Sequence, residues 1–95
     1  MKKNLVIFGS NELAELSHYY FSNDSDYNIQ AFCLDGEYIK ESSFLNLPVI
    51  AFEEISSQFP PDANSLFVAL SYSKINALRK EKFLVAKSLG YELPS

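Results

Sequence analysis

The sequence is poor in the residues from which most disulfide, zinc and hydrolytic sites are built. It contains one cysteine, one histidine and no tryptophan in 95 residues. Cys33 has no second cysteine to pair with, and the apolar run around it, Ile29 to Leu34, predicts a buried thiol that fills the core. His18 has no triad partners near it in the sequence, and Ser10 has no base. We therefore predict no catalytic residue and no metal site in this chain.

Basic residues are also scarce. Eight lysines and arginines face twelve acids, for a net charge of −4 and a pI near 4.8. Such a chain has little with which to neutralise a nucleic-acid backbone, so nucleic acid is excluded as a partner. No apolar stretch reaches the roughly 18 residues of a membrane span. The start, Met1 to Lys3, is followed by too short an apolar segment for a signal peptide. A cytoplasmic location is expected.

Aromatic residues, by contrast, are abundant, with eight phenylalanines and six tyrosines. They fill a compact core with few residues, which suits a chain of this length. Length and composition predict one domain spanning residues 1–95. Because the pattern stops as a last strand begins at Tyr91, we expect this domain to be a fragment of a longer protein.

Four segments predict strands of a parallel sheet, of which the first and fourth are apolar throughout, as buried parallel strands are, and the third, with Pro48 near its start, is an edge strand. They are Leu5–Phe8, Asn28–Leu34, Leu47–Ala51 and Leu66–Leu70. Helical spacing and turn residues predict helices between them. The first helix begins after Ser10 and ends near Ser22. The second is short and extends from Phe52 to Phe59, with Glu53 and Glu54 in its acidic first turn. The third extends from Lys74 to Leu89. The stretch from Glu37 to Asn46 is less regular and predicts a loop with one helical turn.

The helical periodicity also predicts which residues are buried. In the first helix the apolar residues at helical spacing are Leu13, Ala14, Leu16, Tyr20 and Phe21. In the last helix one face contains Ile75, Leu78, Val85, Ala86 and Leu89. Gly90 follows at the position where a helix-terminating glycine belongs. Strands that alternate with helices predict an α/β fold, a Rossmann-like open parallel sheet of order 3-2-1-4 with helices on both faces and a short fifth strand at Tyr91.

Ligands of open parallel sheets bind beyond the carboxyl ends of the strands, where the strand order reverses. That position lies between the first and fourth strands, at Gly9 to Glu12 and Ser71 to Lys74. Gly9-Ser10-Asn11-Glu12-Leu13-Ala14 is a degenerate form of the glycine-rich dinucleotide fingerprint, in which Asn11 replaces the middle glycine. Glu12 adds a negative charge that disfavours an anion. The alternative is an ordinary turn with Glu12 at a helix N-terminus.

Asp35 ends the second strand at the same edge, near the spacing of the acid that binds ribose hydroxyls in dinucleotide domains. The alternative is that Asp35-Gly36 is only a turn. Across the expected crevice, Ser71 lines the loop and Tyr72 is placed to stack on a base. Lys74 and Arg79 are candidate phosphate partners at the start of the last helix. The alternatives are a packing tyrosine and a solvated helix face.

The order of these motifs resembles the N-terminal domain of bacterial sugar acyltransferases of the PglD/NeuD type. The matching segments are Lys3–Gly9 with Ala14, Ala31–Asp35, Leu47–Ile50, Phe67–Leu70 and Leu89–Tyr91. The resemblance implies a domain that binds a nucleotide-linked sugar such as a UDP-sugar, for surface polysaccharide or glycan biosynthesis. It implies a following left-handed β-helix that forms trimers and transfers an acyl group from acetyl-CoA, with no cofactor held by the present chain.

The loop after the first strand departs from that family, whose pattern is Gly-x-Gly-Gly-His-Ala. By position, Gly9, Ser10 and Asp35 carry over as ligand contacts, whereas Asn11 to Leu13 match a binding role poorly. Two other functions stay open. In the first alternative the chain is a module that orients the parent enzyme without binding a nucleotide, which Ala77 and Leu84 on the outer face of the last helix favour. In the second alternative it is a regulator that binds a NAD-type dinucleotide.

Overall fold

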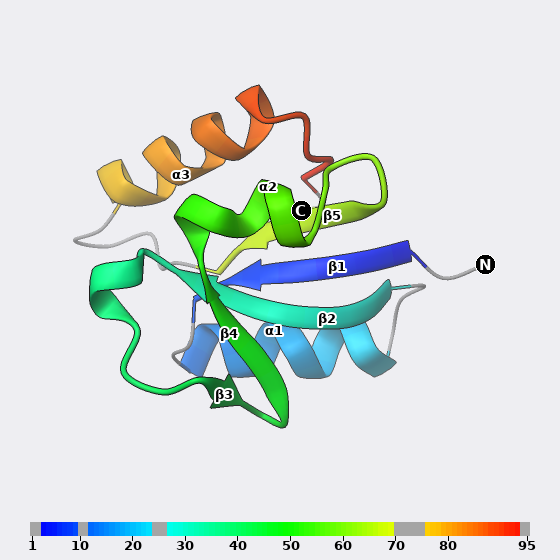
Figure 1. Ribbon diagram of the computed structural model, residues 1–95. Helices are drawn as coiled ribbons and strands as arrows, with labels where there is room; N and C mark the ends of the chain where they lie inside the picture. Colours follow the sequence, from blue (N-terminus) through cyan, green and yellow to red (C-terminus); the bar gives the residue numbers. More distant parts are fainter. Residues whose placement is uncertain (1–2, 10–11, 24–26, 70–75, 94–95) are drawn as a thin grey trace.

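The computed structural model describes residues 3–9, 12–23, 27–69 and 76–93 of the chain. Within them the chain forms a sheet of order β3-β4-β2-β1-β5, with helices packed against both of its sides (Figure 1). The strands are β1 (Lys3–Phe8), β2 (Tyr27–Leu34), β3 (Ser43–Phe44), β4 (Leu47–Ala51) and β5 (Asn64–Val68). The helices are α1 (Glu12–Asn23), α2 (Ile55–Gln58) and α3 (Asn76–Ser88), with 3₁₀ turns η1 (Gly36–Tyr38) and η2 (Phe52–Glu54).

The predicted parallel sheet is confirmed. β1 pairs in parallel with both β2 and β5, and β2 pairs in parallel with β4, which is the predicted 3-2-1-4 order. The apolar run of β1 explains its central place, because Leu5, Val6 and Ile7 are all fully buried. A strand that is apolar on both faces is stable only where helices cover both sides of it.

One edge of the sheet differs from the prediction. Part of the segment interpreted as a loop forms β3, which pairs antiparallel with β4. The two residues between the strands, Leu45 and Asn46, have φ values of 51° and 66°. Positive φ at both central residues is typical of the tight hairpin turn whose twist matches paired strands, and asparagine tolerates it well. At the other edge, the expected fifth strand is a single parallel bridge between Ser65 and Glu92.

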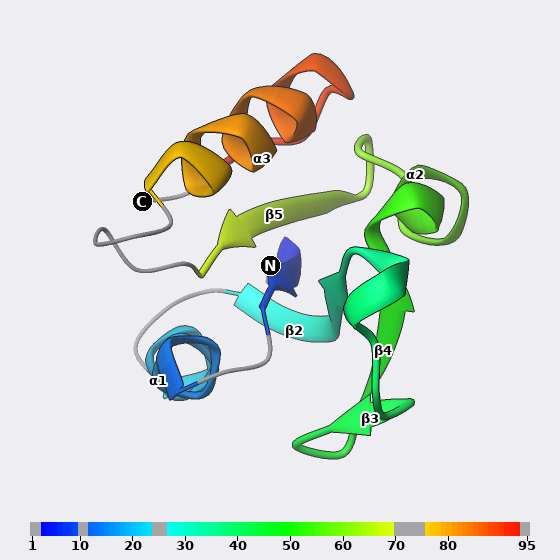
Figure 2. The ribbon, with the colours of Figure 1, turned by 90° about the vertical axis from the view of Figure 1, so that its left-hand side faces the viewer.

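Two separate apolar clusters lie on the two sides of the sheet. On one side α1 contributes Ala14 and Phe21, which pack with Phe32 of β2. On the other side α3 contributes Ala86, and the η2–α2 segment contributes Phe52 and Ile55. Figure 2 shows α1 on one side of β2 and β5, and α3 on the other. Among the described residues, no helix has the length and apolar character that crossing a membrane requires.

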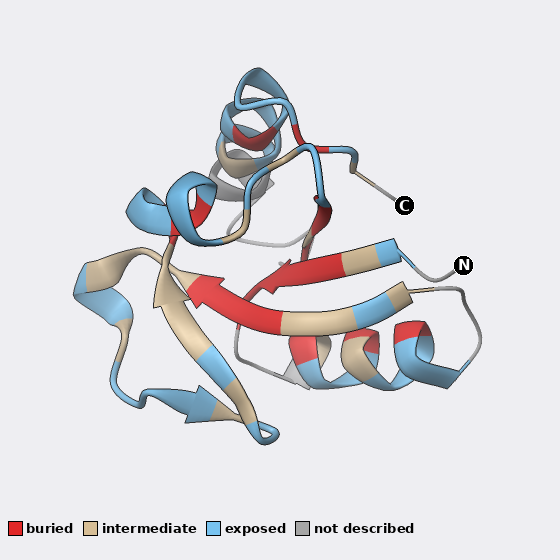
Figure 3. Ribbon diagram, turned by 45° about the vertical axis from the view of Figure 1, so that its right-hand side comes forward, coloured by how far each residue is buried: buried red, intermediate tan, exposed pale blue. Residues whose placement is uncertain are grey.

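The predicted inner face of α1 is partly wrong. Leu16 and Tyr20 are 63% and 53% exposed, while the buried residues are Ala14, Ser17 and Phe21. Ser17 can be buried because its hydroxyl donates a hydrogen bond to the carbonyl of Leu13 at 2.7 Å, which satisfies its polar atom within the helix. The buried positions lie along the side of α1 that faces the sheet, and the exposed positions lie on the opposite side (Figure 3).

The predicted inner face of α3 is also partly wrong. Ala86 is fully buried, but Val85 and Leu89 are each 39% exposed. The helix turns Lys82, four residues before Ala86, toward the sheet. Long aliphatic stems with a charged end commonly cover apolar surface in this way. Ile75 lies outside the described residues.

The end of α3 agrees with the prediction for Gly90. Its φ is 101°. The Gly90 and Tyr91 amides donate to the carbonyls of Lys87 and Ala86, the pair of bonds that closes a Schellman motif. This turn directs Tyr91 back into the core, where it is 4% exposed.

Candidate functional site

The carboxyl ends of β1 and β2 lie side by side, as the sequence predicts. The Gly9 amide, directly after β1, donates to the carbonyl of Cys33 at 2.9 Å, and the Ala69 amide donates to the carbonyl of Phe8 at 2.9 Å. The hydrogen bonding of β1 with β2 and with β5 therefore continues to the last residue before the loop. Gly9 and Asp35 both leave the sheet at this edge, where the strand order reverses between β1 and β5.

Gly9 is required by this geometry. Its φ is 130°, a value that L-amino acids with a side chain rarely adopt, and a Cβ atom there would lie 3.0 Å from the carbonyl oxygen of Ala69. Ala14, the small residue predicted for close helix–strand packing, lies 3.6 Å from the same position. Both features of the fingerprint that keep backbone close to backbone are thus present.

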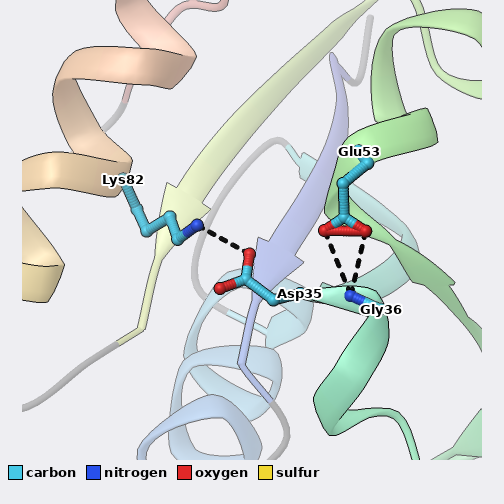
Figure 4. Close-up of polar contacts among 4 residues, drawn as sticks. All are labelled: Asp35, Gly36, Glu53 and Lys82. Atoms are coloured by element: carbon cyan, nitrogen blue, oxygen red, sulfur yellow. Dashed lines mark hydrogen bonds and ion pairs between the residues drawn. The ribbon is translucent and has the colours of Figure 1, made fainter.

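Asp35 is an ion-pair partner as well as the end of β2. Its Oδ1 atom lies 2.6 Å from the ammonium nitrogen of Lys82 on α3 (Figure 4), and the two side chains are 21% and 13% exposed, respectively. The ammonium also lies 5.0 Å from the ring centroid of Phe52 and 5.7 Å from that of Phe8. A cation over aromatic faces gains further electrostatic stabilisation. Lys82 is therefore anchored at the carboxyl edge of the sheet.

The turn after Asp35 is held by a second acid. The Gly36 amide donates to both carboxylate oxygens of Glu53, at 3.1 and 3.0 Å (Figure 4). Gly36 begins η1, and the Tyr38 amide donates to the carbonyl of Asp35 at 2.9 Å. Glu53, predicted only as an acidic first turn, thus joins η2 to the end of β2. The edge combines two carboxylates with one ammonium.

Cys33 lies beneath these charges and is fully buried. Burial raises the pKa of its thiol well above the ordinary value, and the nearby Asp35 carboxylate raises it further. A thiol held in its neutral form is a poor nucleophile. The prediction that Cys33 fills the core is confirmed.

The predicted site residues fall into three groups. Gly9 and Asp35 both lie at the carboxyl edge of the sheet, directly after β1 and β2. Glu12 and Arg79 lie in the first turns of α1 and α3, where only the backbone is described. The predicted contacts Ser10, Asn11, Ser71, Tyr72 and Lys74 lie outside the described residues. Within the described part of the chain, no cluster of histidine, cysteine and acidic residues that could hold a metal ion is found.

Sequence reasoning missed Lys82. A signal for it exists, because position 82 lies four residues after Leu78 and four before Ala86, inside the apolar stripe of the last helix. A lysine within such a stripe must direct its ammonium toward a partner. Asp35, at the end of a neighbouring buried strand, is that partner.

The structure has one cavity beside the end of β2 and another at the opposite, amino edge of the sheet. One, of about 290 Å³, lies between β2, η1 and the β3–β4 hairpin, with Leu34, Tyr38 and Phe44 among its lining residues. The other, of about 380 Å³, lies at the amino ends of β1 and β5, lined by Lys3, Asn64 and others. Neither cavity is lined by Gly9, Asp35 or Lys82.

No family model matches the chain, and no curated protein matches its sequence. Solved structures do match its fold. The acetyltransferase domain of PglB from Neisseria gonorrhoeae aligns over 98% of this chain with a TM-score of 0.75 and 17% identity. UDP-D-quinovosamine 4-dehydrogenase from Vibrio fischeri aligns over 98% with a TM-score of 0.70 and 11% identity. RSP, a Rex-family repressor, aligns over 90% with a TM-score of 0.62 and 11% identity.

These likenesses establish the Rossmann-like α/β fold and confirm, at the level of fold, the resemblance to the N-terminal domain of sugar acyltransferases. The chain spans less than half of the PglB domain, covering 43% of it, and 76% of the dehydrogenase chain. The PglB domain has also been solved in complex with acetyl coenzyme A.

Proposed function

We propose that this chain is the nucleotide-sugar-binding domain of a sugar acyltransferase, with its ligand at the carboxyl edge of the sheet beside Gly9 and Asp35. The observation that carries the proposal is the position of Asp35. It is a carboxylate at the end of β2, at the strand-order reversal, with a tightly turned Gly9 on the neighbouring strand. This supports the proposal because open parallel sheets bind ligands at that point.

The chemistry of the edge suits a ligand with hydroxyl groups and a phosphate. The Asp35 carboxylate accepts hydrogen bonds from sugar or ribose hydroxyls, and the missing side chain of Gly9 lets a ligand approach the backbone. Lys82 supplies a positive charge 2.6 Å from Asp35. When ligand hydroxyl groups bind the Asp35 carboxylate, the ammonium of Lys82 becomes available to bind the ligand phosphate. In this proposal Ser10, Asn11, Glu12, Ser71, Tyr72, Lys74 and Arg79 form the remainder of the site.

The other parts of the assembly rest on the resemblance. We propose that acyl transfer from acetyl-CoA takes place on a following left-handed β-helix, in a trimeric cytoplasmic protein of surface polysaccharide or glycan biosynthesis. The short span of this chain relative to the PglB domain, 43%, agrees with a further domain. The present chain then holds and orients the sugar nucleotide.

A second candidate has an observation in its favour. Asp35 and the Gly36 amide already have protein partners, Lys82 and Glu53. An edge whose polar groups are satisfied internally suits a module that orients the parent enzyme without a nucleotide. The exposed Leu84 on α3, 53% exposed, offers such a module a surface on which to dock.

A titration followed by ¹⁵N–¹H NMR separates the two candidates. UDP-sugars and UDP should shift the amide signals of Gly9 and Gly36, whereas NAD should leave them unchanged. The proposal of nucleotide binding is rejected if UDP and UDP-sugars shift neither signal at about millimolar concentration, because any dissociation constant is then weaker than about 1 mM. Shifts with NAD alone favour the dinucleotide regulator.

Glu12 provides a variant that acts on phosphate alone. A carboxylate at the start of α1 opposes a second anion, so Glu12→Gly should tighten the binding of UDP. Glu12→Gln, which removes the charge without adding backbone freedom, is the matched control and should have most of the same effect. Equal UDP affinity in the wild type and both variants places the phosphate away from this loop.

A further inference from the structure

The outer face of α1 is apolar where a surface helix is ordinarily polar. Leu16, Tyr19 and Tyr20 are 63%, 66% and 53% exposed. Their spacing of three and four residues places them side by side on one face of the helix. Figure 3 shows this exposed side turned away from the sheet, opposite the buried side. A contiguous exposed apolar patch of this kind is typical of a contact surface.

The outer face of α3 has a second, smaller apolar patch. Phe83 and Leu84 are 39% and 53% exposed. Lys80 and Lys87, both exposed, flank them at the same helical spacing. Ala86 and Lys82 occupy the opposite, inward side of the helix. We refer to Leu16, Tyr19 and Tyr20 with Glu15 as the α1 face, and to Phe83, Leu84, Lys80 and Lys87 as the α3 face.

The two faces are complementary in charge. α1 contains Glu12 and Glu15 and no lysine or arginine, and Glu15 is exposed. The α3 face has a net positive charge, because it contains two lysines, while one exposed acid, Glu81, lies at its edge, three residues before Leu84. Two α1 faces or two α3 faces brought together would oppose like charges. An α1 face on an α3 face places apolar residues against apolar residues and lysines near Glu15.

The faces point away from each other on one molecule, because α1 and α3 cover opposite sides of the sheet (Figures 1 and 2). They cannot meet within a single chain. We infer that a second copy of this chain docks its α3 face on the α1 face of the first, in a head-to-tail contact. Such a contact leaves one face of each kind open in a dimer, so association continues to rings or short chains.

Tyrosine and phenylalanine suit the centre of this contact. Their rings bury a large area with few rotatable bonds, and lysines at the rim can lie over the tyrosine faces. Because Glu15 and the lysines are exposed, they contribute more to orientation and rate of encounter than to affinity. A weak, salt-sensitive association follows.

Two single substitutions, each blocking one face at a well-exposed position, test the inference. Leu16→Lys places a cation on the α1 face, and Leu84→Glu places an acid on the α3 face. Sedimentation velocity of the wild-type chain should show a mass that increases with concentration beyond that of a dimer. Each variant alone should stay monomeric, with unchanged circular dichroism.

The decisive measurement is the mixture of the two variants. Leu16→Lys keeps its α3 face and Leu84→Glu keeps its α1 face, so the equimolar mixture should associate although neither variant does so alone. A two-fold contact between α1 faces gives another result, in which Leu84→Glu alone still dimerises. That result, or a wild-type chain that stays monomeric at about millimolar concentration, overturns the inference.

Charge reversal provides an independent measurement. Glu15→Lys should weaken association about three- to tenfold, as expected for a rim charge near two lysines. Lys80→Glu combined with Lys87→Glu should weaken it similarly, and all three changes in one chain should restore it. Glu41→Lys, at an exposed loop position away from both faces, is the control for net charge and should have no effect. Equal weakening by Glu41→Lys contradicts the contact.

Discussion

The ammonium nitrogen of Lys82 lies 2.6 Å from Oδ1 of Asp35, which ties α3 to the end of β2 across the carboxyl edge of the sheet. The lysine side chain is 13% exposed and also contacts the rings of Phe8 and Phe52. The pair therefore joins the packing of one helix to the position of the candidate ligand-binding carboxylate. Any ligand of Asp35 meets a carboxylate that already has a partner.

Lys82→Met should lower the free energy of unfolding by about 1–3 kcal/mol. A fully buried carboxylate deprived of its partner costs about 3–5 kcal/mol, and the residual exposure of this pair reduces that penalty. Urea unfolding measures the change. Lys80→Met, on the outer face of the same helix, is the matched control and should change stability by less than about 0.5 kcal/mol. Equal effects of the two substitutions show that the ion pair contributes nothing to stability.

The ligand roles of the pair can be separated with UDP and uridine. Asp35→Asn should weaken the binding of both about tenfold or more, because the hydroxyl groups lose a charged acceptor. Lys82→Met should weaken the binding of UDP more than that of uridine, because only UDP has phosphates. Isothermal titration calorimetry at two salt concentrations measures both. A Lys82→Met variant that binds UDP as tightly as the wild type assigns the phosphate to another cation.

The sequence was sufficient for the parallel core because β1 and most of β5 are continuous apolar runs. Leu5–Phe8 and Leu66–Val68 could be assigned to buried strands without any knowledge of their neighbours. β3 could not, because two residues in a hairpin have no periodicity, and only the positive φ of Leu45 and Asn46 closes the turn.

The helix faces were harder to predict because apolar spacing alone does not determine which side of a helix packs. Ser17 is buried and forms a hydrogen bond within its own helix, and Lys82 is half-buried and pairs with a partner 47 residues earlier in the chain. Both are polar residues on an inner face, where periodicity assigns apolar ones. Asp35 and Gly9 could be placed at one edge from the topology alone. The contacts of Asp35 with α3 and of Gly36 with Glu53 are long-range and required the structure.

Gly9→Ala should destabilise the fold by about 1–3 kcal/mol, because a side chain there meets both an unfavourable φ and the Ala69 carbonyl oxygen at 3.0 Å. Thermal unfolding measures the loss. Gly90→Ala separates the two causes. Its φ of 101° is also positive, but its Cβ would lie 3.6 Å from Pro61, an ordinary contact. Gly90→Ala should therefore destabilise the fold less than Gly9→Ala does. The reverse order contradicts the close approach of β1 and β5 at this edge.

Tyr91 should make the stability of the chain decrease at alkaline pH. Its hydroxyl donates to the carbonyl of Phe59 at 2.5 Å, and burial raises its pKa from an ordinary value near 10 to about 12. The folded state thus favours the protonated phenol, so its contribution is complete below pH 10 and is lost as the pH rises through 12.

Tyr91→Phe should lower stability at neutral pH by about 0.5–1.5 kcal/mol through loss of that hydrogen bond. It should also remove this alkaline component, so that the stability difference between wild type and variant shrinks as the pH rises from 10 to 12. Urea unfolding at a series of pH values measures both effects. Tyr38→Phe is the control, because that ring is 62% exposed and the substitution should leave a curve parallel to that of the wild type. A difference between wild type and Tyr91→Phe that stays constant over this interval means that the phenol of Tyr91 ionises as readily in the folded chain as in the unfolded one.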